Sequence, residues 1–255
     1  MNPFLEQYYN NWLGEAEVKS ETTLKSRGLR TFVPLCGKSL DLLYLVKRGH
    51  CVEGLEGAEK ALAEFTQEHG MTRKEVPIEL SLPDDLKSEF SLFEFTGEVA
   101  EPPSKVTEVP EGSKIDITPG SLRIWKGNLF RLKDVPDFPR YNFWFDRGSF
   151  IAIDPATRGE YVALVHKLLA PGAKMLLLSF QYKKEEMQGP PNTLSYEEVV
   201  EFFTPGSATS PLPASAKYRV TLIDLVEYKP GVREHRFTKL SWAADPVILI
   251  EKLED

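Results

Sequence analysis

The sequence predicts an α/β protein with a doubly wound, mostly parallel sheet, and three observations support this fold class. Short apolar segments alternate with segments of helical periodicity along most of the 255 residues. Residues 29–56 read as strand, turn, helix and strand within about thirty residues, a spacing typical of parallel neighbours. The sequence has no internal repeat, and no apolar run approaches the ~20 residues of a membrane span.

Composition narrows the classes of function. The chain is 42% hydrophobic and 27% charged, which is ordinary for a globular protein, and its length suits one domain. The net charge of −7 and the scattered basic residues argue against nucleic acid as a partner. Cys36 and Cys51 lie in apolar strand-like runs and read as reduced thiols, and no secretory signal is recognisable at the N-terminus. We therefore expect a cytoplasmic monomer that contacts no membrane.

Residues 1–24 begin with a predicted amphipathic helix. Asn2 suits the capping position and Pro3 the first helical position. The apolar residues that recur on one face are Phe4, Leu5, Tyr8, Tyr9, Trp12 and Leu13. Such a helix either docks on a core or forms a lid over a ligand, and both interpretations remain open.

The next elements form a βαβ unit and an insertion. The expected strands are 29–35 and 51–56, and the expected helices are 40–48 and 59–69, ending at Gly49 and Gly70. Residues 72–120 interrupt the alternation with six prolines and many acidic residues. We expect a loosely structured insertion with short strands around 92–95 and 114–117, and no separate domain.

The alternation resumes after the insertion. The expected strands are 122–126, 141–146, 174–182, 218–227 and a last one within 237–250. A helix is expected from Pro155 to Leu169, ended by Pro171-Gly172, and a second helix follows the capping box of Ser195 and Glu198. The last two strands have no helix between them, which favours an antiparallel hairpin.

Gly37 and Glu56 are the first candidate site residues. Ligands of doubly wound sheets bind at the carboxyl ends of the strands, where both residues are expected. Glycine permits a sharp turn and close approach to a ligand, and Glu56, nineteen residues later, can accept hydrogen bonds from both hydroxyls of a ribose. A turn glycine and a solvated glutamate are the alternative. The absence of G-x-G-x-x-G disfavours NAD or FAD, whereas S-adenosylmethionine has no phosphate to bind.

A second candidate segment, Phe145-Asp146-Arg147-Gly148-Ser149, follows the expected strand at 141–146. Its polar residues are expected to face the same cleft, unless they form a surface ion pair. The four histidines and two cysteines show no metal-ligand spacing, and no G-x-S-x-G elbow is present. Cys36 precedes a helix N-terminus, but a small apolar strand-end residue explains it better than a nucleophile.

Several segments together resemble the thiopurine S-methyltransferase family. They are Phe32-Val33-Pro34-Leu35-Cys36-Gly37-Lys38-Ser39-Leu40-Asp41, Arg48-Gly49-His50, Gly54-Leu55-Glu56, the 145–153 segment, Gly189-Pro190-Pro191 and Glu251-Lys252-Leu253. The resemblance covers most of residues 1–255 except the insertion. It implies a single domain with the Rossmann-like fold of class I S-adenosylmethionine-dependent methyltransferases: a seven-stranded, mostly parallel sheet with an antiparallel last strand and helices on both faces.

The resemblance also implies roles for matching positions. The residues expected around the cofactor are Trp12, Leu35, Gly37, Glu56, Asn128, Leu129 and Arg147. Trp12 packs on the cofactor, Glu56 holds the ribose, and Arg147 also lies near the acceptor as the catalytic candidate. Two features depart from the family pattern and bear on the acceptor pocket: the stretch between Trp12 and Leu35 is shorter than in the vertebrate enzymes, so that Lys19 stands near the family's acceptor-contacting aromatic residue, and the insertion is long. A second family arginine, near the C-terminus, matches either Arg233 or Arg236.

The expected activity is methyl transfer from S-adenosylmethionine to a small thiol or a related soft nucleophile. The acceptor can instead be a halide, a selenium or tellurium species, an amine or a carboxylate. A catalytically silent protein that binds an adenosyl ligand is a rival of another class. A nicotinamide oxidoreductase is disfavoured by the missing glycines.

Overall fold

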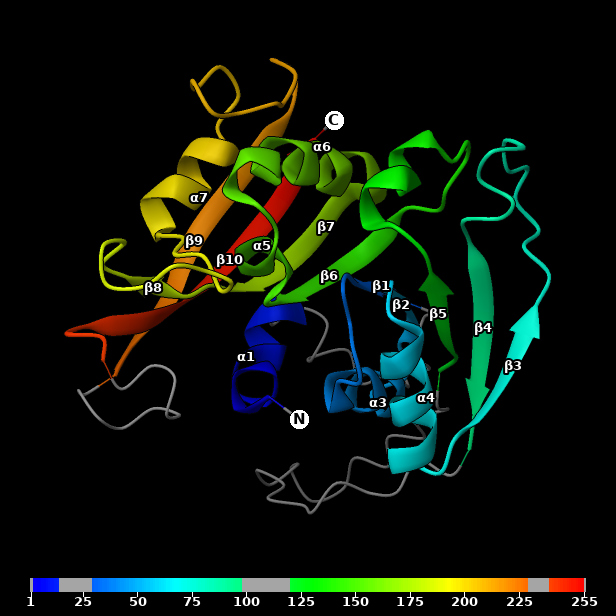
Figure 1. The fold of residues 1–255 in the computed structure, drawn as a ribbon. Coiled ribbons are helices and arrows are strands. Elements are labelled where there is room, and N and C mark those ends of the chain that lie inside the picture. The colour runs from blue at the N-terminus through cyan, green and yellow to red at the C-terminus, as the bar shows by residue number, and fades with distance from the viewer. Residues whose placement is uncertain (1, 14–28, 98–119, 229–238, 255) are drawn as a thin grey trace, which may run out of the picture. The chain divides into compact units, whose positions relative to one another are not determined.

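The computed structural model describes residues 2–13, 29–97, 120–228 and 239–254. These residues form two compact units, 1–137 and 138–255, and each is described by itself (Figure 1).

The first unit is a five-stranded sheet in the order β3-β4-β5-β2-β1. The strands are β1 (Arg30–Val33), β2 (Cys51–Glu56), β3 (Thr72–Val76), β4 (Ser91–Thr96) and β5 (Leu122–Lys126). β2 pairs in parallel with β1 and β5, whereas β3 and β4 add antiparallel strands beside β5. The helices are α3 (Leu40–Lys47), α4 (Glu59–Glu68) and the 3-10 helix η1 (Leu129–Asp134). The parallel βαβ unit predicted from the alternation is confirmed.

Helix α1 (Pro3–Leu13) begins the first unit and is anchored by polar and apolar contacts. The backbone N–H of Phe4 donates to Asn2 Oδ1 at 2.8 Å, which confirms the predicted cap. Leu5, Tyr8 and Tyr9 are buried. The Tyr9 hydroxyl lies 2.6 Å from Nε2 of His50, and Nδ1 of that imidazole lies 2.6 Å from the Thr31 hydroxyl. A buried imidazole therefore joins this helix to β1.

The second unit contains β6 (Tyr141–Arg147), β7 (Leu169–Leu178), β8 (Gln181–Tyr182), β9 (Lys217–Tyr228) and β10 (Ala243–Glu254). β6 and β7 are parallel, and β10 runs antiparallel to β7, β8 and β9. This arrangement confirms the antiparallel closing strand and the final hairpin.

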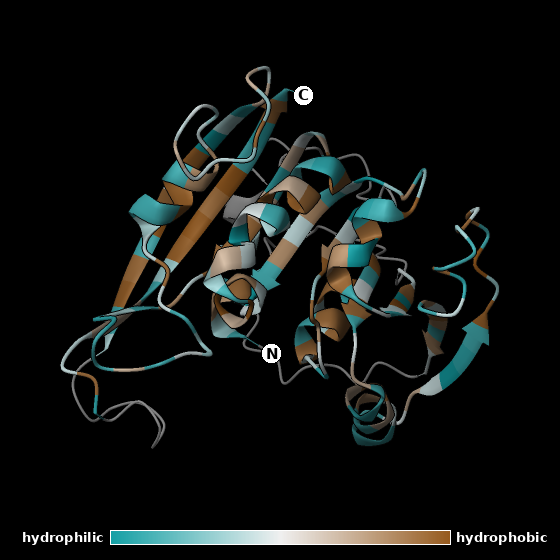
Figure 2. Cartoon of the chain, turned by 45° about the horizontal axis from the view of Figure 1, so that its top comes forward, coloured by the Kyte–Doolittle hydropathy of each residue, from teal (hydrophilic) through white to brown (hydrophobic). Residues whose placement is uncertain are grey.

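The helices of this unit are α5 (Ser149–Ala152), the 3-10 helix η2 (Pro155–Thr157), α6 (Arg158–Leu168) and α7 (Tyr196–Phe202). The views in Figures 1 and 2 both show α5, α6 and α7 on one face of the sheet, and the strands beneath them are largely hydrophobic in Figure 2. Both bonds of the predicted capping box are present at the start of α7, between Ser195 and Glu198.

Some details of the elements differ from the sequence prediction. The short strand expected around 92–95 is present as β4, but the insertion is less loose than expected, because β3 pairs with β4. Residues 114–117 lie outside the described residues. β7 begins at Leu169, so Pro171-Gly172 lies within the strand. The short helix α5 was not predicted. The described residues hold ten strands, which exceed the seven of the expected class because β3, β4 and the two-residue β8 are added.

Candidate functional site

The turn after β1 meets the end of β2 at the residues expected from the sequence. The Gly37 N–H donates to Glu56 Oε2 at 2.9 Å, and the Ala58 N–H donates to Glu56 Oε1 at 2.8 Å. The Cys36 N–H donates to Leu55 O at 2.9 Å, which fastens the turn to β2. Each carboxylate oxygen has capacity for a further hydrogen bond, because such an oxygen carries two lone pairs. The predicted convergence of Gly37 and Glu56 is therefore present.

The backbone of this turn adopts an unusual conformation. Gly37 has φ +54° and Leu35 has φ +41°. Positive φ is common for glycine and rare for leucine, and such residues cluster at ligand-binding sites. The Leu35 side chain is 37% exposed, so an apolar surface lies beside the Gly37 amide.

Cys36 in the turn packs closely against Gly54 of β2. A Cβ on Gly54 would lie 2.7 Å from Cys36 Sγ, so only glycine permits this approach of the turn to β2. Burial raises the pKa of the Cys36 thiol well above its usual range, and the nearby Glu56 carboxylate acts in the same direction. A neutral buried thiol is a poor nucleophile, in agreement with the packing role expected from the sequence.

Asn128 and Leu129 lie at the end of β5, next to the end of β2. The register pairs Glu56 with Lys126, and the Gly127 N–H donates to Glu56 O at 3.3 Å. Asn128 is exposed and caps η1 by accepting the Phe130 N–H at 3.0 Å, whereas the side chain of Leu129 is buried. The structure thus brings five of the predicted residues to the carboxyl ends of adjoining parallel strands: Leu35, Gly37, Glu56, Asn128 and Leu129.

The remaining predicted residues are placed less completely. Trp12 lies on α1, but its side chain is outside the described part. Arg147 belongs to the second unit, where it ends β6 as an exposed residue opposite Leu178 of β7. Lys19, Arg233 and Arg236 lie outside the described residues.

Asp146 corrects the expectation that the polar residues after β6 face a cleft. Its side chain is completely buried, and it accepts the Tyr161 hydroxyl at 2.5 Å and the Ser149 N–H at 2.8 Å. Burial raises the pKa of the Asp146 carboxyl, and burial beside this carboxyl also raises the pKa of Tyr161 well above its usual range. The sequence signal for this role is that Asp146 precedes Gly148-Ser149 at the start of a helix, where a carboxylate can accept the free backbone N–H groups.

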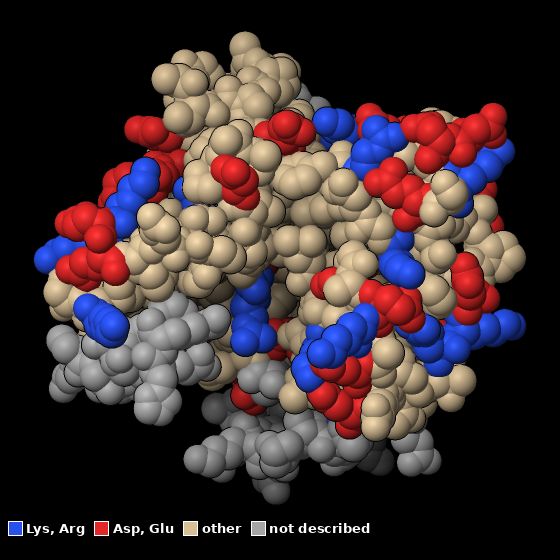
Figure 3. Space-filling view, in the orientation of Figure 1, with Lys and Arg blue, Asp and Glu red and all other residues tan. Residues whose placement is uncertain are grey.

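Surface charges of the first unit are largely paired around α4. Lys38 contacts Glu64 and Glu68, and Glu59 contacts Arg73 and Lys126. Figure 3 shows Lys and Arg interspersed with Asp and Glu on the face that it displays. Among the described residues, no helix is long and apolar enough to cross a membrane.

Comparison with known proteins identifies related sequences and folds. The profile of the family described as thiopurine S-methyltransferase matches residues 18–82 and 85–217. A thiopurine S-methyltransferase of Legionella pneumophila (strain Paris) is 31% identical over 180 residues, 71% of this chain and 66% of that protein. That of Methylococcus capsulatus is 29% identical over 245 residues, 94% of this chain and 85% of that protein.

Two solved structures share the fold at low sequence identity. TehB from Haemophilus influenzae has a TM-score of 0.51 at 9% identity, covering 98% of this chain and 66% of its own. An S-adenosylmethionine-dependent methyltransferase from Methanosarcina mazei also has a TM-score of 0.51, at 13% identity, covering 100% of this chain and 99% of its own. The Rossmann-like α/β fold class predicted from the sequence is thereby confirmed.

Proposed function

The chain belongs to the thiopurine S-methyltransferase family, and we propose that it transfers the methyl group of S-adenosylmethionine to a small thiol or a similar soft nucleophile. The observation that carries the proposal is the Gly37–Glu56 contact at the carboxyl ends of β1 and β2. In doubly wound sheets this is where adenosyl ligands bind, and a carboxylate there selects a ribose.

The residues of the first unit fit this cofactor. Glu56 keeps acceptor capacity for the two ribose hydroxyls, and Leu35 offers apolar surface for the methionine end. We propose that Asn128 and Leu129 lie beside the adenine, with Leu129 contributing its backbone because its side chain is buried. When bound, S-adenosylmethionine supplies a sulfonium methyl carbon that is open to in-line displacement.

Arg147 and Trp12 complete the proposed mechanism. The exposed guanidinium at the end of β6 is proposed to bind an anionic acceptor by charge-assisted hydrogen bonds. Heteroaromatic thiols and selenols ionise readily near neutral pH, so no dedicated base is required. Trp12 is proposed to pack on the cofactor, with α1 as a lid that excludes water from it. Placement of the two reactants accounts for on the order of 7–11 kcal/mol of rate acceleration in well-aligned systems.

We propose that the protein acts as a cytoplasmic monomer with a small-molecule acceptor and without nucleic acid. The net charge of −7 and the paired basic residues around α4 support the last point, because a phosphate backbone attracts unpaired cations.

The first test is calorimetric titration with S-adenosylhomocysteine, followed in the same preparation by methyl transfer to thiols, selenite and iodide. Binding together with turnover of a thiol is expected. Binding with turnover only of iodide or selenite would move the acceptor to another class, and no binding would remove the proposal together with the Gly37 and Glu56 assignments.

Arg147→Ala tests the acceptor role separately from cofactor binding. We expect kcat/KM for the acceptor to fall at least about tenfold while the affinity for S-adenosylhomocysteine changes less than about twofold. Arg140→Ala, an exposed arginine immediately before β6, is the matched control and leaves both quantities unchanged. Equal losses in binding and turnover for Arg147→Ala would contradict the role.

A further inference from the structure

The turn that carries Arg147 needs support from outside itself. Arg147 ends β6, Gly148 follows with φ +108°, and α5 contains four residues. A helix this short is not stable on its own, because the conformational entropy lost on nucleation exceeds the stabilisation from one turn of hydrogen bonds. The N-terminal end of α5 is held by Asp146, near the end of β6, and the C-terminal end by Asn192, which precedes α7.

Asp146 holds the N-terminal end. Its Oδ1 accepts the Ser149 N–H at 2.8 Å, and the Phe150 N–H lies 3.3 Å from its Oδ2. The same Oδ2 accepts the Tyr161 hydroxyl of α6 at 2.5 Å, and that hydroxyl in turn accepts the Trp144 indole N–H at 3.1 Å. The side chains of Trp144, Asp146 and Tyr161 are all fully buried, so this chain of hydrogen bonds ties the turn to α6.

Asn192 holds the C-terminal end. Its Nδ2 donates to Ile153 O at 3.0 Å and to Ile151 O at 3.3 Å, and its backbone N–H donates to Ile151 O at 2.6 Å. These are carbonyls of the last turn, which have no partner within a helix. One asparagine therefore acts as the C-terminal cap of α5.

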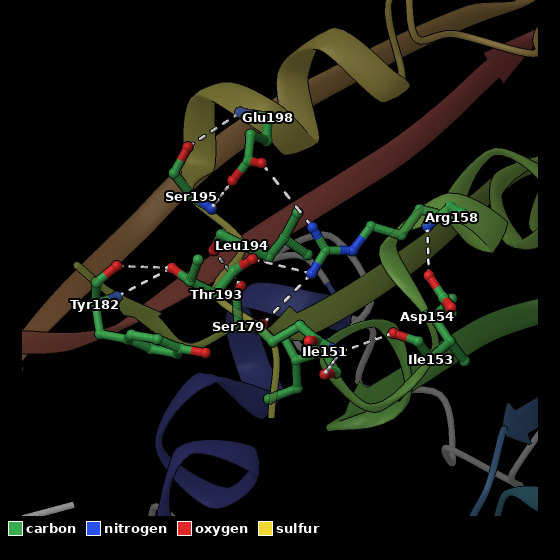
Figure 4. A network of polar contacts seen from close by, with 12 residues as sticks. Ile151, Ile153, Asp154, Arg158, Ser179, Tyr182, Thr193, Leu194, Ser195 and Glu198 are labelled. Atoms are coloured by element: carbon green, nitrogen blue, oxygen red, sulfur yellow. Dashed lines mark hydrogen bonds and ion pairs between the residues drawn. The ribbon is translucent and has the colours of Figure 1, made fainter. Parts of the chain in front are cut away.

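The backbone of the segment around Asn192 is held by hydrogen bonds from side chains of neighbouring elements (Figure 4). The guanidinium of Arg158 on α6, a buried side chain, donates to Thr193 O at 2.9 Å and to Asn192 O at 3.4 Å. The Ser179 hydroxyl, just beyond β7, donates to Leu194 O at 2.6 Å. The hydrogen bonds of a buried cation are charge-assisted and strong, so the cap has little freedom to move.

We propose that Asp146 and Asn192 are positioning residues that fix the direction of the Arg147 side chain by clamping α5 at both ends. The inference rests on the acceptor role proposed above for Arg147. Asp146 is buried, and the side-chain amide of Asn192 donates to a carbonyl at the end of α5. We therefore propose that both residues affect acceptor binding through the turn that carries Arg147. If the network were purely structural, substitutions in it would lower stability, and their effect on turnover would be the same with or without Arg147.

A double-mutant cycle distinguishes these two cases. Tyr161→Phe removes one hydrogen bond from Asp146, and Asn192→Ala removes the cap; each is made alone and together with Arg147→Ala. Tyr196→Phe is the matched control, because the Tyr196 hydroxyl donates to Val220 O at 3.2 Å in the same unit. The measurements are kcat/KM for the acceptor and affinity for S-adenosylhomocysteine.

In the wild-type background, we expect each single change to lower kcat/KM for the acceptor about fivefold and to change the affinity for S-adenosylhomocysteine less than about twofold. In the Arg147→Ala background, we expect the same change to alter kcat/KM less than about twofold. Losses that persist undiminished in the Arg147→Ala background would overturn the inference. If Arg147→Ala keeps full turnover, the acceptor role fails and the inference falls with it, whereas failure of the wild type to bind S-adenosylhomocysteine identifies an error in the proposed function. Because Tyr161→Phe acts on the N-terminal end of α5 through Asp146 and Asn192→Ala acts on its C-terminal end, misfolding of one variant leaves the other as the test.

Discussion

At the scale of single residues, the turn after β1 combines a residue that the sequence identifies with one that it does not. Gly37 has φ +54°, a conformation for which glycine is the natural choice, and the sequence predicts it. Leu35 has φ +41°, and nothing in a leucine side chain favours this conformation, which costs about 1–2 kcal/mol. The leucine side chain carries no sequence signal for this conformation, so only the structure reveals that two residues of this turn lie in the left-handed region.

Glu56 gives the sharpest prediction at this scale. Glu56→Ala is expected to weaken binding of S-adenosylhomocysteine by about 10- to 100-fold, because hydrogen bonds to a charged group contribute about 1.5–3 kcal/mol. Titration calorimetry measures the change. Glu94→Ala is the control, since Glu94 lies on β4 and forms an exposed ion pair with Arg123 at 3.9 Å. Unchanged affinity of Glu56→Ala would exclude the ribose role.

At the scale of elements, strands with a clear apolar core and helices with caps were predicted well. The bounds of β2 agree at both ends, and α7 begins at its capping box. The misses have physical causes. β7 runs through Pro171-Gly172 because these residues lie in a register irregularity between β6 and β7, where a strand tolerates proline. α5 depends on a C-terminal cap by Asn192, which lies 39 residues beyond Ile153 in sequence. β4 was expected around 92–95, whereas β3, with the sequence TRKEV, has too many exposed charged residues to show an apolar pattern.

The contact of α1 with β1 predicts a dependence of stability on pH. Burial, and secondarily the Arg48 charge, lowers the pKa of His50 to about 4, below the ~6.5 of an unfolded histidine. Because the unfolded chain then binds the proton more tightly, the contribution is complete above pH ~6.5 and is lost as pH falls toward 4. The free energy of unfolding is expected to fall by about 2 kcal/mol from this group between pH 7.5 and 5.

Denaturant unfolding at the two pH values measures this step. His50→Gln is expected to remove it, whereas His69→Gln, a partly exposed histidine at the end of α4, is the matched control and keeps it. A step of equal size in His50→Gln would assign the pH dependence to other groups.

The last strand is joined to α6 by a buried lysine. Nζ of Lys252 donates to His166 O at 2.9 Å and to Leu169 O at 3.0 Å, and the side chain is fully buried. Lys252→Met keeps the apolar stem but leaves two buried carbonyls without this donor, so a loss of about 2–3 kcal/mol is expected. Lys217→Met, which removes only an exposed pair with Glu254, is expected to cost less than about 1 kcal/mol. Equal unfolding midpoints for the two variants in urea would contradict the assignment.

At the scale of the whole molecule, we propose that residues 1–255 fold as one methyltransferase domain, although contacts divide the chain into two compact units. The division leaves Gly37 and Glu56 in the first unit and Arg147 and Lys252 in the second. If the two units unfold as one domain, a ligand that binds residues of one must stabilise both, because cooperative unfolding has a single equilibrium.

Scanning calorimetry tests this proposal with a ligand and a variant that act on different units. S-adenosylhomocysteine at 100 times its Kd adds about 2.7 kcal/mol, which is expected to raise Tm by roughly 5–10 °C. Lys252→Met, in the second unit, is expected to lower the Tm of the same single transition, and the ligand is expected to raise it again by a similar interval. Two transitions, of which the ligand moves one and Lys252→Met the other, would mean that the units unfold independently. S-adenosylhomocysteine would then stabilise only the unit that holds Glu56. That result would contradict the proposal that residues 1–255 fold as one domain.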